Sequence, residues 1–121
     1  MDIGKTLKVR NRDEWRRWLA RHHADTKEIW LVYYKKTSGK PGISYEESVL
    51  EGVAFGWVEG QNKSIDDQCY AARFTPRRPK SNWSASNIAR AKKMLAEGLM
   101  AEPGLASLPD PLGPTVSRRA S

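Results

Sequence analysis

The segment Glu28–Lys36, with the sequence EIWLVYYKK, limits most strongly what this chain can fold into. It carries aromatic and β-branched residues on both of the faces that a strand would present. This pattern is typical of a strand inside a sheet, covered by helices on at least one side and lined by aromatic residues on the other. We therefore expect a central strand here, with the rest of the chain arranged around it.

Three other segments have the apolar spacing of amphipathic helices, with residues recurring every three or four positions. Each follows a residue that can accept a hydrogen bond from the first helical turn, and the first two also have a glutamate placed as in a capping box. The predicted helices are Arg12–His23 after Asn11, a helix from Ser44 to about Gly56, and a helix from Ser84 to just before Gly98.

The remaining regular segments are predicted as strands. Thr6–Arg10 alternates weakly and is expected to form a short edge strand. Residues 57–65 and 69–75 flank Asp66 and Asp67 as the two arms of a β-hairpin. The resulting order, β-α-β-α-β-β-α, predicts an α+β fold with a small, mainly antiparallel sheet and helices packed on one face.

The length of 121 residues allows one domain with one hydrophobic core. We assign this domain to residues 1–108, with a short turn of helix near Leu105, and expect residues 109–121 to form a disordered, proline-rich tail. No stretch is apolar enough over the length of a membrane span, and the N-terminus lacks the apolar run of a signal peptide. A cytoplasmic location is therefore expected.

The net charge of +7 at pH 7 arises in one part of the chain. No acidic residue occurs between Gln68 and Ala96, whereas seven of the 21 basic residues do, which leaves 14 basic against 14 acidic residues elsewhere. The seven are Arg73, Arg77, Arg78, Lys80, Arg90, Lys92 and Lys93. The excess charge therefore points to a local basic site.

The predicted functional site lies in this basic segment. Arg77, Arg78 and Lys80 stand in a proline-rich loop before a predicted helix N-terminus, where unpaired backbone N–H groups favour anions. Guanidinium groups bind phosphate or carboxylate at two points, and an exposed Trp83 offers a ring for stacking. We predict a small anionic or phosphate-bearing ligand and no cofactor. The expected binding residues are Arg73, Arg77, Arg78, Lys80, Trp83, Ser84, Asn87 and Arg90.

Other interpretations of these charges remain open. The arginines can be structural, stacking over aromatic residues and pairing with Glu59, Asp66 and Asp67. A pI near 9.8 is also compatible with binding to nucleic acid, although no helix-turn-helix, zinc-finger, RNP or KH motif occurs. It is equally compatible with binding to an acidic protein partner. A further alternative is a metal carrier or an enzyme that uses Glu59 with Asp66 or Asp67, or a cation held by Glu47 and Glu51.

The sequence offers little for catalysis. Cys69 is the only cysteine, which excludes an internal disulfide and a multi-thiolate zinc site. His22 and His23 are adjacent and would point in different directions from a helix, so they make a poor metal pair. No nucleophile-elbow, P-loop or metalloprotease motif is present. These features favour a non-enzymatic binding protein without a bound metal.

Three motifs occur in a fixed order along the chain. They are YKK followed by SGKP in residues 34–41, FGWVEG in residues 55–60, and RFTPRR-x-x-S-x-W-S in residues 73–84. In this order they resemble the YdeI/OmpD-associated family of small bacterial proteins, often labelled bacteriocin-protection proteins. The resemblance runs from about Val9 to Leu108 and implies a protective or stress role, with no reaction or cofactor attached. Many relatives have Asp in the second motif, where this chain has Glu59.

Overall fold

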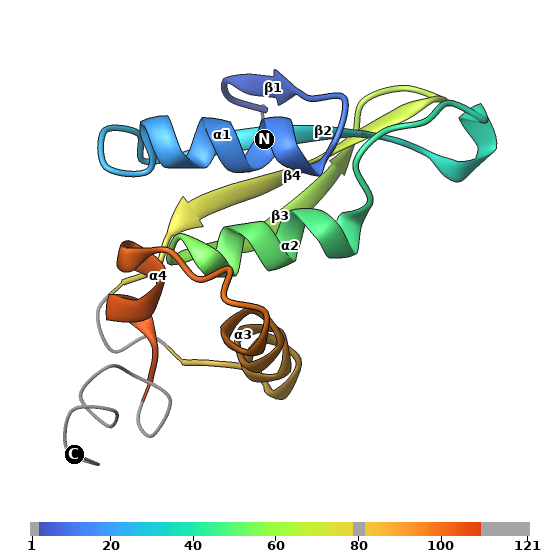
Figure 1. Ribbon diagram of the computed structural model, residues 1–121. Helices are drawn as coiled ribbons and strands as arrows, with labels where there is room; N and C mark the ends of the chain where they lie inside the picture. The colour runs from blue at the N-terminus through green and yellow to red at the C-terminus, as the bar shows by residue number, and fades with distance from the viewer. Residues whose placement is uncertain (1–2, 79–81, 110–121) are drawn as a thin grey trace, which may run out of the picture.

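The computed structural model describes residues 3–78 and 82–109. Four strands form one sheet in the order β1-β2-β4-β3, and helices α1 and α2 cover one of its faces (Figure 1). The elements are β1 (Thr6–Lys8), α1 (Arg12–His22), β2 (Ile29–Tyr34), the 3-10 helix η1 (Lys36–Ser38), α2 (Tyr45–Ala54), β3 (Trp57–Ser64), β4 (Cys69–Pro76), α3 (Ala85–Ala96) and α4 (Glu102–Ser107). The predicted α+β fold is confirmed, while the predicted tail beyond residue 109 lies outside the described residues.

Strand β2 is the interior strand that the sequence predicts. It pairs with β1 on one side and with β4 on the other, and its residues Ile29, Leu31 and Tyr33 are buried under the helices. Two of the three strand pairs are antiparallel, but β1 runs parallel to β2. This parallel pair arises because α1 connects the two strands as a crossover above the sheet.

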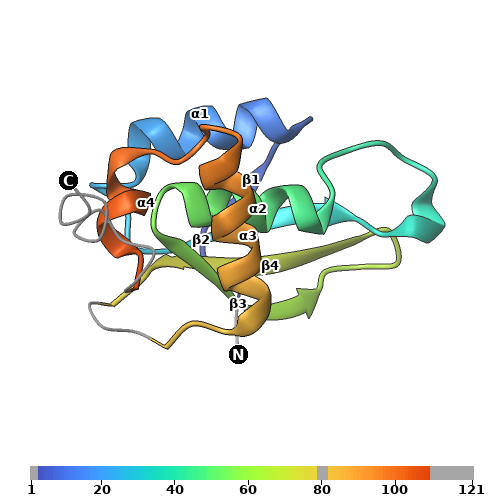
Figure 2. The ribbon, with the colours of Figure 1, turned by 60° about the horizontal axis from the view of Figure 1, so that its bottom comes forward.

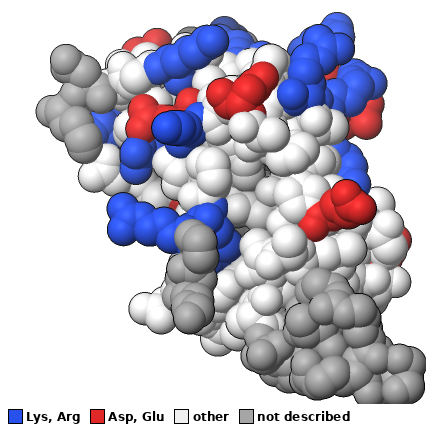
Figure 3. Space-filling view, turned by 90° about the vertical axis from the view of Figure 1, so that its left-hand side faces the viewer, with Lys and Arg blue, Asp and Glu red and all other residues white. Residues whose placement is uncertain are grey.

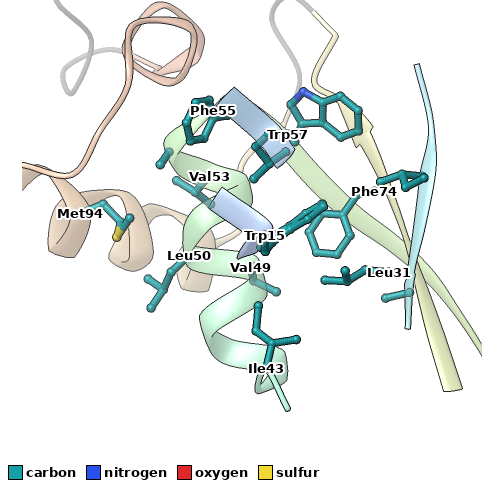
Figure 4. Close-up of a cluster of buried hydrophobic side chains, with 14 of the residues drawn as sticks. Trp15, Leu31, Ile43, Val49, Leu50, Val53, Phe55, Trp57, Phe74 and Met94 are labelled. Carbon is teal, nitrogen blue, oxygen red and sulfur yellow. The ribbon is translucent and has the colours of Figure 1, made fainter. Parts of the chain in front are cut away.

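The core lies between the sheet and α1 and α2. Trp15 of α1 is fully buried, and its ring meets Phe74 of β4 edge to face at 5.0 Å (Figure 4). Its indole N–H donates to the Ser48 carbonyl oxygen of α2 at 2.9 Å, so the polar end of this side chain is satisfied inside the core. One residue thus joins both helices to the sheet.

Glu51 forms a second link between α1 and α2. Its side chain is buried and ion-paired with Arg12 and with Arg16, the latter at 2.7 Å between Nη1 and Oε1. Glu47 accepts from the Ser44 backbone N–H at 3.1 Å, which completes the predicted capping box. The two carboxylates that the sequence offered as cation ligands are therefore both engaged by protein donors.

Helices α3 and α4 pack against α2 on the same side of the sheet (Figure 2). Ala91 and Met94 are the buried residues of α3. Ile88 and Leu95, which the sequence also predicted to face inward, are only partly buried. Among residues 3–78 and 82–109, no helix combines the length and apolarity needed to cross a membrane.

Candidate functional site

A pocket of about 520 Å³ opens at the end of the sheet where β4 leads toward α3. Phe55, Trp57, Pro76 and Pro103 give it an apolar lining. Basic and aromatic residues complete the wall, together with residues of α4. The full lining is His23, Phe55, Gly56, Trp57, Pro76, Arg77, Arg78, Trp83, Pro103, Ala106, Ser107, Leu108 and Pro109. We call this the anion pocket, since its described lining contains two arginines and no carboxylate.

Arg77 is held in place at the edge of the anion pocket. Its backbone N–H donates to the Gly56 carbonyl at 2.9 Å, and its Nη1 donates to the Asn82 carbonyl at 3.2 Å. Its guanidinium carbon lies 3.8 Å from the centre of the Trp83 ring. Burial lowers the pKa of Arg77, which nevertheless remains a cation near neutral pH.

Trp83 differs from its predicted state. The sequence predicts an exposed ring, whereas the structure leaves it only partly exposed. The Trp83 ring packs against the hydrophobic core and is also covered by the Arg77 guanidinium. Arg77 and Trp83 therefore form a stacked pair that shapes one wall of the pocket.

Two further basic side chains line the anion pocket. Arg78 is exposed, so its guanidinium can reach a ligand at the mouth. His23 lies at the end of α1, with Nδ1 3.0 Å from the Leu19 carbonyl oxygen. When Nδ1 carries the proton for that bond, Nε2 is left to contact a ligand.

The structure does not bring all the predicted anion-binding residues together. Arg73 pairs in register with Trp30, on the sheet face away from α1 and α2, and its Nε lies 2.6 Å from an oxygen of Glu28. It is therefore not part of the anion pocket. Lys80 lies outside the described residues.

Ser84, Asn87 and Arg90 line a second pocket of about 240 Å³ between α2, β3 and α3. Arg90 is bound at two points by Glu46, with Nε–Oε2 at 3.0 Å and Nη2–Oε1 at 2.9 Å. Its Nη1 also donates to Asn87 Oδ1 at 2.8 Å. Trp57 lines both pockets, so the predicted single site is divided into two adjacent ones.

A cluster of tyrosines borders the second pocket. The Tyr45 hydroxyl donates to Glu59 Oε1, and the buried Tyr33 hydroxyl lies 2.6 Å from Ser48 Oγ. Burial raises the pKa of Tyr33, while burial and the neighbouring Glu59 raise the pKa of Tyr45 to about 12. Sequence reasoning missed this cluster, although alternation along β2 and β4 places Tyr33 and Tyr70 on one face, where their rings stack at 4.9 Å.

The raised pKa of Tyr33 predicts a loss of stability at high pH. The unfolded chain releases the tyrosine proton above about pH 10, while the folded chain retains it, so the free energy of unfolding falls as pH rises. We expect Tyr33→Phe to remove up to about 1.4 kcal/mol per pH unit of this decline. Urea unfolding of both proteins across that range measures it. Equal slopes would contradict the expectation, and near neutral pH neither protein should show this decline.

The structure does not bring Glu59 and Asp66 together into the acidic site that the sequence offers as an alternative. Glu59 pairs in register with Phe74, whereas Asp66 lies in the turn beyond the end of β3. Asp66 Oδ1 accepts from the backbone N–H groups of Gln68 and Cys69, each at 2.8 Å, so it stabilises that turn. Within the described part of the chain, no group of three or more His, Cys, Asp or Glu residues could hold a metal ion.

A family model matches residues 7–107, and its description is "Domain of unknown function (DUF8412)". No curated protein and no solved structure gives a significant match. This match does not test the resemblance to the YdeI/OmpD-associated family, which stays a prediction from the motifs.

Proposed function

The chain belongs to the family described as a domain of unknown function (DUF8412), so we propose its function from its own geometry: it is a non-enzymatic protein that binds a small anionic ligand with an apolar body. The anion pocket is the observation that carries this proposal. Arg77 and Arg78 line it, and none of its described lining residues is acidic.

The apolar lining defines the rest of the ligand. Phe55, Trp57 and Pro103 offer contact area to a flat or hydrophobic group, and Trp83 adds an aromatic ring beside the guanidinium of Arg77. An anionic group near the arginines and an apolar group against these residues would use both parts of the wall. A nucleoside monophosphate or an aromatic carboxylate has this chemistry.

The surroundings favour a discrete ligand over a long polyanion. Three cations of the basic segment are ion-paired: Arg73 with Glu28, Arg90 with Glu46, and Lys93 with Glu97. On the face shown in Figure 3, acidic residues lie among the basic ones, and uncharged areas separate them. On this face, the described basic residues therefore do not form a continuous track for a duplex.

The proposal is tested by comparing two arginines of the same segment. Adenosine monophosphate, salicylate and inorganic phosphate are titrated by calorimetry and thermal shift, and a probe at 100 times its Kd stabilises by about 2.7 kcal/mol. We expect the first two to bind more tightly than phosphate, because they also use the apolar lining. Arg78→Ala should weaken binding about tenfold or more. Arg73→Ala is the matched control and should have no effect, since Arg73 lies on the other sheet face.

Two outcomes would overturn the anion site. One is that no anionic probe raises the unfolding temperature, and the other is that Arg73→Ala weakens binding as much as Arg78→Ala. A short oligonucleotide distinguishes nucleic-acid binding, because a track of three or more phosphate contacts gives a slope of log K against log salt of about −3 or steeper on duplex. A single anionic group gives a much shallower slope.

The motif resemblance adds a cellular role to the proposal, which is protection against bacteriocins or another stress. The ligand would then be an anionic compound encountered under that stress. Deleting the gene should sensitise the cell, and the Arg78→Ala protein should fail to restore protection while the Arg73→Ala protein restores it. If both variants restore full protection, the protective role does not depend on the anion pocket.

A further inference from the structure

We propose that the second pocket, between α2, β3 and α3, binds a neutral polyhydroxylated ligand through two adjacent hydroxyl groups. Glu59 would accept from one hydroxyl and Asn87 would donate to the other. This site is separate from the anion pocket, and Trp57 is the residue that lines both.

The pocket holds about 240 Å³ and takes polar side chains from three elements. Tyr45 begins α2, Glu59 lies on β3, and Ser86, Asn87 and Arg90 lie on α3. Several of these side chains are fixed by contacts with one another or with Glu46. The pocket is therefore a preorganised polar site and not a gap between apolar surfaces.

Glu59 supplies the hydrogen-bond acceptor. The Tyr45 hydroxyl occupies its Oε1, and Tyr45 remains a donor because its pKa is raised to about 12. An ionised carboxylate has about four lone-pair positions, so Glu59 can accept further bonds from a ligand. The β3 wall of the pocket is thus an acceptor wall.

The opposite wall, formed by α3, supplies donors. Asn87 Oδ1 accepts from Arg90 at 2.8 Å, which leaves the N–H₂ group of the same amide for a ligand. Ser84 Oγ accepts from the Asn87 backbone N–H at 3.1 Å, whereas the preceding amides of the first turn have no acceptor within the helix. The Ser86 hydroxyl lies 3.2 Å from Ser84 Oγ, and when Ser84 is the donor of that pair, Ser86 keeps its own O–H for a ligand.

The charges disfavour ions of either sign. An anion would meet the Glu59 carboxylate, and Arg90 offers it little because Glu46 already binds that guanidinium at two points. A cation would meet the positive end of α3, and the described lining offers it one carboxylate, Glu59, which already accepts from the Tyr45 hydroxyl. A hydroxyl group both donates and accepts, so two adjacent hydroxyls match the acceptor wall and the donor wall together. Tyr45, which is 36% exposed, offers ring area to the C–H face of such a ligand.

The test is an NMR titration of backbone amides with myo-inositol and D-ribose. We expect shifts that saturate and that are confined to the lining of this pocket, with Glu59, Ser86 and Asn87 foremost. Asn87→Ala and Glu59→Ala should each weaken binding about tenfold or more. Glu97→Ala removes another carboxylate adjoining α3, one paired with Lys93 away from the pocket, and should leave binding unchanged.

Several results would overturn the proposal. A shift of these amides by phosphate, methylammonium or acetamide at lower concentration than by either polyol would assign the pocket to another ligand class. The proposal is equally wrong if Asn87→Ala and Glu59→Ala, each shown to be folded by circular dichroism, bind the polyols as tightly as the unchanged protein does. Arg78→Ala should not alter polyol binding, so failure here and failure of the anion pocket are distinguishable.

Discussion

Replacing Arg12 and Arg16 together with alanine should destabilise the protein by about 3–5 kcal/mol. Both arginines pair with Glu51, whose side chain is only 3% exposed. Their loss would leave the Glu51 carboxylate buried without a counter-charge. The protein could then avoid the buried charge only if the carboxylate took up a proton or the contact between α1 and α2 opened. Chemical denaturation at neutral pH measures the effect.

Two matched variants show whether the buried charge is the cause. Arg10→Ala with Arg17→Ala removes one arginine just before α1 and one within it. Their side chains are 87% and 68% exposed, so the change should have only a small effect on stability. Adding Glu51→Leu to the Arg12 and Arg16 double variant should restore much of the stability. If it restores none, the loss comes from other arginine contacts, such as that of Arg16 over the Phe55 ring.

Gly104→Ala should displace α4 and disrupt the anion pocket. A Cβ at this position would lie 2.0 Å from the Ala54 carbonyl oxygen and 2.4 Å from its carbonyl carbon. Both are backbone atoms at the end of α2, so no side chain can rotate away and the helix itself must move. We expect a loss of about 1–3 kcal/mol, the usual range for overpacking, or more.

The displacement should also affect ligand binding, because α4 contributes Pro103, Ala106 and Ser107 to the pocket wall. Anion affinity should fall together with stability in Gly104→Ala, as measured by calorimetry with adenosine monophosphate. Gly60→Ala is the control, since its Cβ would have only an ordinary contact, 3.8 Å from the Arg73 carbonyl oxygen. Unchanged stability in Gly104→Ala would show that α4 is not tightly held against α2.

Local patterns predicted the secondary structure well. The capping residues Asn11, Ser44 and Ser84 begin α1, α2 and α3 as expected, because a cap depends on residues within one helical turn. Strand β2 was identified as central from its own composition. The parallel pairing of β1 was not predicted, since it depends on where the α1 crossover places the chain.

The candidate site was only partly predictable. Strand alternation already separates Arg73 from Phe74, and could have shown that Arg73 faces away from the core. The pairing of Arg90 with Glu46 could not be read in this way, because 44 residues separate them. The hydrogen bond between Tyr45 and Glu59, which helps to make the second pocket polar, could not be predicted from the sequence either.

The sequence by itself determined the α+β class, the helix starts, and the excess of positive charge between Gln68 and Ala96. These depend on composition and on neighbours along the chain. Only the tertiary structure decided which cations are neutralised by distant carboxylates and which line a pocket. The physical reason is that ion pairs and pockets depend on distances between segments, and the fold sets those distances. It divides one basic stretch of sequence into a paired surface, an anion pocket and a mixed polar pocket.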